Sequence, residues 1–205
     1  MKWNLKKVIK ETNHNFLNFY TLVYDITKDD NTHYEYEYYI ASRHDQEHLL
    51  PISKNYEKTD GVVMALYYID EKSGELSLLF TRQFRPSVST YLTSFPAGLV
   101  DKDDKDITTS IKREAKEEAG VNITDIEILA SNGTTSSGLS DEMNVVALAR
   151  ITSFGDKSLE EFEDINTFLV KLKDLKEMLN DKKYLFPINI KIITLYLLER
   201  FKNYL

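Results

Sequence analysis

Two stretches near the N-terminus alternate between apolar and polar residues, as half-buried β-strands do. They are FYTLVYDI (19–26) and HYEYEYYIAS (33–42), and a polar DDNT connection separates them. The pattern predicts a β-hairpin. Aromatic side chains occur on both faces of its second arm, so neither face is expected to be simply solvated. We expect residues 1–18 to form a short lead-in segment.

A second series of apolar runs has the length of buried strands and is interrupted by helical periodicity. GVVMALYYI and LSLLFTRQF are joined by a tight turn, which favours two buried antiparallel strands. Strands are predicted at 61–69, 76–84, about 91–95, 126–130, 143–151 and 165–172, and helices at about 107–119, near 172–179 and from about 188. Strands in series with helices packed on them predict an α/β (α+β) fold, an α/β/α sandwich on a mixed sheet.

The stretch 43–60 mixes polar and apolar residues around Pro51 without a sustained period. It therefore predicts a boundary between two parts of the chain. We expect an N-terminal β-hairpin subdomain over 1–55 and the main domain over 56–205.

Composition narrows the class of protein. The 205 residues are 42% hydrophobic, contain no cysteine and carry a net charge of −7. A proper core is therefore possible, and disulfides, thiolate metal sites and cysteine nucleophiles are excluded. The acidic balance argues against electrostatic binding of nucleic acid. The basic start MKWNLKK is not followed by an apolar run of signal or membrane-spanning length, so a cytoplasmic protein without a membrane partner is the simplest expectation.

Three glutamates stand out on the predicted helix of about 107–119. Asp106 is a good N-cap for this helix and Gly120 a good residue to end it. Glu114 and Glu118 are four residues apart and share a face, with Glu117 beside them. Such spacing is by itself more typical of a solvated helix face, but like charges there repel. A bound Mg²⁺, or Mn²⁺, would remove that repulsion, because both ions prefer oxygen ligands.

The residues around this helix resemble the Nudix box, which reads G, five residues, E, seven residues, R-E, an apolar residue, any residue, E-E, any residue and G. The segment Arg113 to Val121, REAKEEAGV, fits its second half, although Ala115 is small for the apolar place. The first half departs from the pattern. Five residues after Gly98 comes Asp104 in place of Glu, and eight residues separate it from Arg113. Two alternatives are that Asp103 or Asp106 takes the acidic place instead, or that this protein does without an acidic residue there.

Further segments resemble the ADP-ribose pyrophosphatase branch of this family. They follow one another in the expected order and cover most of the chain: YEYEYYIASR (34–43), RQFRP (82–86), FPAGLVD (95–101), GLSDE (138–142) and EFEDI (161–165). The resemblance implies a magnesium-dependent hydrolase that splits ADP-ribose into AMP and ribose 5-phosphate. A nucleotide-sugar or other nucleoside-diphosphate pyrophosphatase is the alternative within the enzyme class.

The resemblance also implies roles for acidic residues. Glu114 and Glu118 would be the inner metal ligands, Glu117 and Glu163 further metal-linked residues, and the Ala97 carbonyl would complete the coordination. Arg113 would orient the glutamates by ion pairing. Glu161 matches the catalytic general base best, and Glu142 is the alternative base.

Substrate recognition falls by resemblance to arginines that can fork onto phosphate oxygens. These are Arg43, Arg85 and, with less support, Arg82; Tyr38 or Tyr39 would stack on the adenine. In this branch the N-terminal hairpin commonly crosses to a second subunit, which implies a homodimer. The four histidines show no ligand spacing and are expected at the surface.

From a different functional class comes a Nudix-fold module that binds a nucleotide with weak or no catalysis. Two features motivate it: the altered first half of the box, and Ser137 where the branch often has proline. The retained Glu114 and Glu118 argue against it, because a pure sensor has no obvious need for them.

Overall fold

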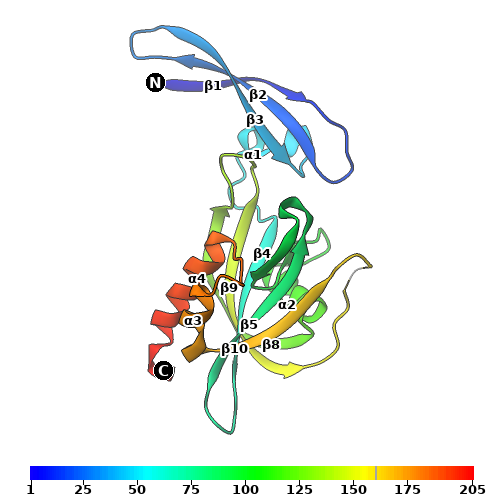
Figure 1. The fold of residues 1–205 in the computed structure, drawn as a ribbon. Coiled ribbons are helices and arrows are strands. Elements are labelled where there is room, and N and C mark those ends of the chain that lie inside the picture. Colours follow the sequence, from blue (N-terminus) through cyan, green and yellow to red (C-terminus); the bar gives the residue numbers. More distant parts are fainter. Residues whose placement is uncertain (160) are drawn as a thin grey trace. The chain divides into compact units, whose positions relative to one another are not determined.

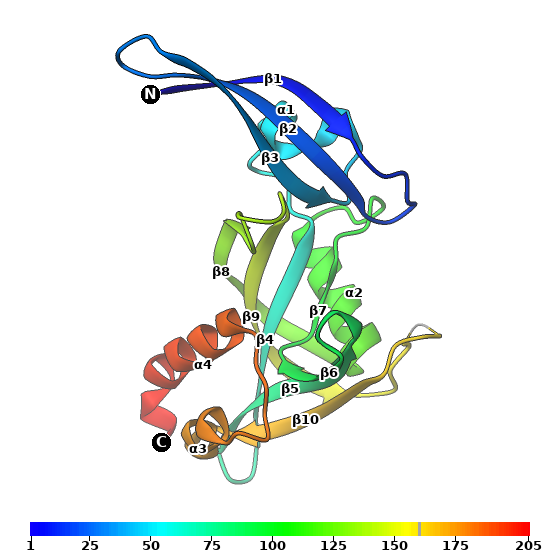
Figure 2. The ribbon, with the colours of Figure 1, turned by 45° about the horizontal axis from the view of Figure 1, so that its top comes forward.

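The computed structural model describes residues 1–159 and 161–205, apart from the side chain of Asn132, and divides the chain into two compact units. The first unit consists of Met1–Asp60 and Asn132–Asn144. The second consists of Gly61–Ser131 and Val145–Leu205. Figures 1 and 2 show the elements of each.

The first unit contains a three-stranded antiparallel sheet in the order β1-β2-β3 (Figure 1). Its strands are β1 (Lys2–Lys10), β2 (Asn18–Thr27) and β3 (His33–Ser42), followed by a 3-10 turn, Gln46–His48, and the short helix α1 (Leu50–Ser53). A small core of Tyr20, Leu22, Ile40 and Leu49 packs on one face of the sheet. The predicted hairpin is confirmed as β2 and β3.

The expectation of a lead-in segment over residues 1–18 is wrong, because residues 2–10 form strand β1. The pairing of β1 with β2 shifts in register between Leu5 and Lys7. Such an irregularity interrupts the alternation of faces on which strand prediction depends. The apolar residues Trp3 and Leu5 therefore do not continue in phase with Val8.

The second unit is built on a seven-stranded sheet in the order β10-β5-β4-β9-β8, with β6 paired to β5 and β7 to β4. The strands are β4 (Gly61–Ile69), β5 (Leu76–Arg85), β6 (Thr90–Ser94), β7 (Ala97–Leu99), β8 (Val121–Thr134), β9 (Met143–Phe154) and β10 (Ile165–Lys171). Pro86–Val88, Leu172–Asp174 and Lys202–Tyr204 form 3-10 turns.

Helices cover both faces of this sheet (Figures 1 and 2). Helix α2 (Ile107–Ala119) lies on one face, and α3 (Leu175–Asn180) and α4 (Ile188–Arg200) lie on the other. Strand β4 contributes to both layers, because Val62, Met64 and Leu66 pack with α2 while Val63 and Ala65 pack with α3 and α4. The predicted α/β/α sandwich on a mixed sheet is confirmed.

The apolar stripe predicted for the C-terminal helix faces the core. Ile190 and Leu197 are buried, and Ile193 and Phe201 pack partly buried against the same cluster. Among the described residues, no helix has both the length and the apolar character needed to span a membrane.

Candidate functional site

Helix α2 begins and ends at the residues that its sequence predicts. The Asp106 carboxylate caps the first turn by accepting a hydrogen bond from the Thr109 N–H at 2.8 Å. Gly120 ends the helix in the left-handed conformation, with φ 65°. Ile111 and Ala115 are fully buried against the sheet, so the rotation of the helix about its own axis is fixed.

Glu114 and Glu118 project from α2 toward strand β7 and are each only 8% exposed. The Ala97 N–H donates a hydrogen bond to Glu118 Oε2 at 2.9 Å. The carboxyl group of Glu114 lies directly over Gly98, where a Cβ atom would overlap it. The two carboxylates are therefore seated on the backbone of residues 97–98, and the absence of a side chain at position 98 makes room for one of them.

The electrostatics of the pair favour a cation. Burial raises the pKa of Glu118 to about 7; the Ala97 N–H opposes this rise, and the negative charges of Glu114 and Glu163 add to it. The nearby positive charge of Arg85 lowers the pKa of the same group. Burial also raises the pKa of Glu114, against the opposing hydrogen bond from Arg113. Buried carboxylates that repel one another are stabilised in their charged form by a bound cation.

Arg113 connects this pair to the loop before the helix. Its guanidinium group donates to Glu114 at 2.8 Å, to Glu117 at 3.0 Å and to the Leu99 carbonyl at 3.0 Å. It also forks onto both oxygens of Asp104, at 2.9 and 3.4 Å. The ion pairs that we expected between Arg113 and the glutamates are present. Of the aspartates at 103, 104 and 106, the one bound to Arg113 is Asp104.

The hydrogen bonds from Arg113 hold the pKa of Asp104 at about 2, well below its usual range. The Asp101 N–H donates to the same carboxylate at 3.1 Å. Asp104 is therefore a fully charged partner of Arg113 at neutral pH. Sequence reasoning did not identify this pairing, because a separation of nine positions does not predict a contact.

The family resemblance implies a divalent metal, and the donor set fits one. Glu114 and Glu118 supply two buried carboxylates, and Ala97 is in direct contact with Glu118. Within the described part of the chain, no three acidic or histidine side chains already stand close enough together to hold an ion. The backbone carbonyl predicted at Ala97, or a movement of Glu117 or Glu163, would have to complete the coordination.

The acidic loop after β9 is attached at both ends. The Gly155 N–H donates to the Gly120 carbonyl at 2.6 Å, and the Ser158 N–H donates to the Glu117 carbonyl at 3.0 Å. At the far end, the Tyr91 hydroxyl donates to Asp164 at 2.6 Å. Glu160 in this loop is outside the described residues. These contacts bring Glu163 near Glu118, while Glu161 is exposed in the same loop.

The two arginines of β5, Arg82 and Arg85, have different neighbours. Arg85 ends the strand, and its charge acts on Glu118 as described above. The guanidinium group of Arg82 lies 5.4 Å from the centre of the Tyr91 ring, as in a cation–π contact. Tyr91 and Asp164, which link β6 to the acidic loop, carry no signal in the sequence that would have identified them.

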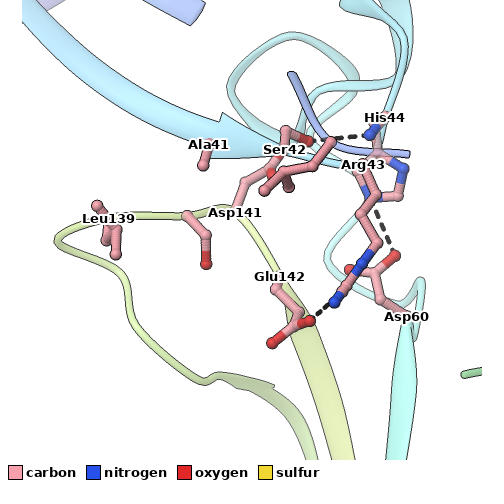
Figure 3. A pocket seen from close by; sticks show the side chains of 10 residues that line it. Ala41, Ser42, Arg43, His44, Asp60, Leu139, Asp141 and Glu142 are labelled. Atoms are coloured by element: carbon pink, nitrogen blue, oxygen red, sulfur yellow. Dashed lines mark hydrogen bonds and ion pairs between the residues drawn. The ribbon is translucent and has the colours of Figure 1, made fainter. Parts of the chain in front are cut away.

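The first unit has a pocket of about 180 Å³ of its own, lined by residues of β3 and of the loop 139–142 (Figure 3). Arg43 forms an ion pair with Glu142 there, and Figure 3 shows the two side chains pointing toward one another. The Thr135 hydroxyl donates to the other carboxylate oxygen of Glu142 at 2.7 Å. The guanidinium group of Arg43 also lies 5.1 Å from the centre of the Phe16 ring. The structure therefore brings together a predicted substrate arginine and a predicted alternative base.

The expectation that all histidines lie at the surface is wrong for His44. Its side chain is 15% exposed, and its Nε2 atom lies 2.9 Å from Asp60 (Figure 3). Asp60 also accepts a hydrogen bond from the Met143 N–H at 2.9 Å. A polar partner distant in sequence makes this burial possible, and such a partner is not visible in the local pattern.

The two predicted adenine-stacking tyrosines differ in exposure. Tyr38 packs partly buried against the small core, and its hydroxyl donates to the Ser137 carbonyl at 3.4 Å. Tyr39 is 50% exposed and stacks on Phe19 with the ring centres 6.1 Å apart. Of the two, Tyr39 has the accessible ring.

The fold and site together define an α/β/α protein organised around a helix with two buried carboxylates. A model of the NUDIX domain matches residues 58–188. The chain belongs to the Nudix family.

Comparison with individual proteins gives one short sequence match and two longer structural ones. A curated yeast protein, the ADP-ribose pyrophosphatase of Saccharomyces cerevisiae, is 43% identical over 60 residues. That match covers 29% of this chain and a quarter (25%) of the yeast protein's length.

Among solved structures, a crystal structure of an ADP compounds hydrolase has a TM-score of 0.68 at 15% identity and covers 98% of this chain and 94% of that one. The NUDIX domain of Shewanella oneidensis NrtR, in complex with ADP ribose, has a TM-score of 0.54 at 17% identity and covers 70% of this chain and 88% of that one. At such identities the likeness shows the fold.

Proposed function

We propose that this protein is a divalent-metal-dependent Nudix hydrolase that splits ADP-ribose into AMP and ribose 5-phosphate. The observation that carries the proposal is the pair of buried carboxylates, Glu114 and Glu118, seated on the backbone of Ala97 and Gly98. A helix face that only met solvent would not bury two glutamates with raised pKa values.

Glu114, Glu118 and the Ala97 carbonyl would hold Mg²⁺ or Mn²⁺, with Glu117 and Glu163 as further metal-linked residues. When bound, the metal would neutralise part of the phosphate charge and lower the pKa of the attacking water. Arg113 keeps Glu114 and Glu117 in place through its ion pairs. Arg85, whose charge acts at Glu118, would bind a phosphate oxygen.

In the hydrolysis, water attacks a phosphorus atom and the bond from that phosphorus to the bridging oxygen breaks. We assign Glu161 to accept the proton of the water, because it best matches the family's catalytic glutamate and belongs to a loop attached beside the carboxylates. Glu142 is the alternative base. The ion pair of Glu142 with Arg43 argues for a different role, that of holding the arginine.

The name of the yeast relative supports ADP-ribose as the substrate, and so do the segments that resemble this branch of the family. Arg43 would bind a phosphate group and Tyr39 would stack on the adenine, with Arg82 as a further phosphate-binding residue and Tyr38 as the alternative to Tyr39. A nucleotide-sugar or other nucleoside-diphosphate pyrophosphatase remains the second enzymatic candidate.

We also propose a homodimer formed through the N-terminal sheet. The sheet exposes aromatic rings that a second copy would cover, with Trp3 53% exposed and Tyr36 44% exposed. A monomeric mass in analytical ultracentrifugation would refute the dimer. A cytoplasmic location stays a prediction.

The alternative of a non-catalytic binding module loses part of its motivation. It depended on the altered first half of the box, but Asp104 in that half binds Arg113 through two oxygens. The altered loop therefore still supplies an acidic partner to the helix.

Turnover of ADP-ribose, nucleotide sugars, dinucleotides and nucleoside triphosphates with Mg²⁺ and with Mn²⁺ tests the substrate. We expect the highest kcat/KM for ADP-ribose. Equal or higher values for another member of the panel would move the assignment to that substrate, and binding without turnover of any of them would favour the binding module.

Glu118→Gln tests the site. It keeps the shape but removes the charge, so we expect turnover to fall on the order of 10³-fold, with ligand binding largely intact. Glu71→Gln, in an exposed turn, is the matched control and should retain full activity. An active Glu118→Gln protein would refute the metal assignment.

A further inference from the structure

The loop half of the box differs from the Nudix pattern in two ways at once. Asp104 stands where the pattern has Glu, and eight residues instead of seven separate it from Arg113. An aspartate is one methylene shorter than a glutamate, a loss of reach of about 1.5 Å. One additional backbone residue adds at most about 3.3–3.6 Å of reach. The insertion is therefore long enough to make up for the shorter side chain.

The contacts show that Asp104 does reach Arg113. Two of its oxygens accept from the guanidinium group, at 2.9 and 3.4 Å, and the Asp104 side chain is only 6% exposed. A local turn holds the aspartate in position, since the Asp104 N–H donates to the Asp101 carbonyl at 3.2 Å and the Asp101 N–H donates back to the Asp104 carboxylate at 3.1 Å. This is a defined geometry within the loop.

We place the additional residue in the loop before the helix. The helix begins at the capped residue Asp106, and within it Arg113 to Gly120 keep the spacing of the pattern. Between Asp104 and Asp106 stands a single residue, Lys105, and it is exposed. Lys105 can therefore be removed without removing a buried contact of its own.

We propose that the aspartate and the additional loop residue are a compensating pair, and that Asp104 is a positioning residue which acts through Arg113 on the carboxylates. The same Nη1 atom of Arg113 binds Glu114 and Glu117, and Nη2 binds Asp104 and the Leu99 carbonyl. Arg113 already donates to Glu114 through Nη1, and loss of Asp104 would free Nε and Nη2 to bind the glutamates more fully, so that the charge of Arg113 competes with a cation. The inference rests on the proposed function where activity or Mn²⁺ affinity is the readout, whereas the Tm of the metal-free protein tests it independently.

Four proteins test the compensation: wild type, Asp104→Glu, deletion of Lys105, and the two changes together. The readouts are Mn²⁺ affinity, measured by isothermal titration, and the thermal midpoint Tm of the metal-free protein. We expect each single change to weaken Mn²⁺ binding roughly 10-fold or more and to lower Tm. The combined protein should bind Mn²⁺ within about 3-fold of wild type and regain most of the Tm. A combined protein no better than the weaker single variant overturns the compensation.

Asp104→Asn tests the positioning role with a change that preserves shape. It should weaken Mn²⁺ binding roughly 10- to 100-fold, while Asp103→Asn, one residue away and exposed, should leave it unchanged. Wild-type Mn²⁺ affinity in Asp104→Asn overturns the role.

Activity is measured last and separates the two proposals. If wild type turns over no member of the substrate panel, the proposed function fails, while the Tm comparison of the metal-free proteins still decides this one. If wild type is active, kcat should follow Mn²⁺ affinity across the four proteins, with KM at saturating metal nearly constant.

Discussion

Two arginines of this protein are bound to carboxylates in opposite ways. Arg113, in the second unit, is 25% exposed in its side chain and ion-pairs with Asp104, Glu114 and Glu117. Arg43, in the first unit, is 36% exposed and has one carboxylate partner, Glu142, together with the ring of Phe16. The first guanidinium group is surrounded by the protein's own acceptors, and the second faces a pocket of about 180 Å³.

The difference separates positioning from recognition. A guanidinium group has five N–H donors in a fixed fork, and those of Arg113 are committed to three carboxylates and the Leu99 carbonyl. It has little left to offer a substrate. Arg43 can exchange a single carboxylate for a phosphate group, so it retains the capacity to bind one. Changing each arginine to lysine, which keeps the charge and removes the fork, should therefore have different consequences.

Arg113→Lys should have the largest effect. A lysine cannot bind Asp104 and both glutamates at once, so we expect turnover to fall on the order of 10²-fold or more and Tm to fall by several degrees. Arg200→Lys is the matched control, because Arg200 also forks onto one carboxylate, that of Glu127, at 2.9 and 2.6 Å. It should leave turnover unchanged. Equal losses of turnover and Tm in the two variants would mean that the forked contacts of Arg113 serve stability alone and do not position the glutamates.

Gly98→Ala should come next. The added methyl group would overlap the Glu114 carboxyl group. Because the Glu114 side chain is flexible, it would move, and its carboxylate would no longer lie against β7. We expect a loss of turnover of roughly 10²-fold with a smaller loss of stability, measured by steady-state kinetics and thermal unfolding. Gly133→Ala, whose new methyl group would be in ordinary contact with the Asn144 carbonyl, is the control. Full activity of Gly98→Ala would contradict the placement of Glu114.

The comparison also shows which parts of the molecule a sequence can predict. Helix α2 carries its own signals, namely the cap at Asp106, the stop at Gly120 and the apolar pair Ile111 and Ala115, and the structure has it over the predicted range. These signals are local and depend on helix geometry alone. The nearly continuous apolar run of β4 likewise predicts a strand that is buried on both sides.

What the sequence could not predict are the partners. Asp104 and Arg113, Tyr91 and Asp164, and Arg43 and Glu142 are 9, 73 and 99 positions apart in the sequence. Such pairs depend on how loops return to the sheet, which no local period encodes. Strand β1 was missed for a different reason, because its register shift hides the alternation. The carboxylates could be found from the pattern, whereas the residues that hold them required the structure.

Arg43→Lys should have a smaller effect than the changes around Arg113. The lysine keeps a charge for phosphate but loses the fork, so we expect KM for ADP-ribose to rise roughly 10-fold, with kcat within about 3-fold and Tm unchanged. Glu142→Gln is the companion variant, since it frees Arg43 without removing it, and KM should not rise. If kcat falls in Glu142→Gln by the 10²-fold or more typical of a lost general base, Glu142 rather than Glu161 is the base.

The smallest effect concerns pH and sharpens the account of Arg113. The pKa of Asp104 is about 2 in the folded protein because Arg113 binds its charged form, and an aspartate in an unfolded chain has a pKa of about 3.9. The unfolded state therefore binds more protons between these values, so the contribution of Asp104 to stability is complete above about pH 4 and is lost as the pH falls through about 2. Asn at this position cannot titrate. The stability advantage of wild type over Asp104→Asn, measured by urea unfolding, should be constant from pH 7 to about 5 and reduced by roughly half at pH 3. An advantage that stays constant down to pH 3 would mean that Arg113 does not bind the charged form of Asp104 in preference to the neutral one, and the two arginines would then differ less than their contacts indicate.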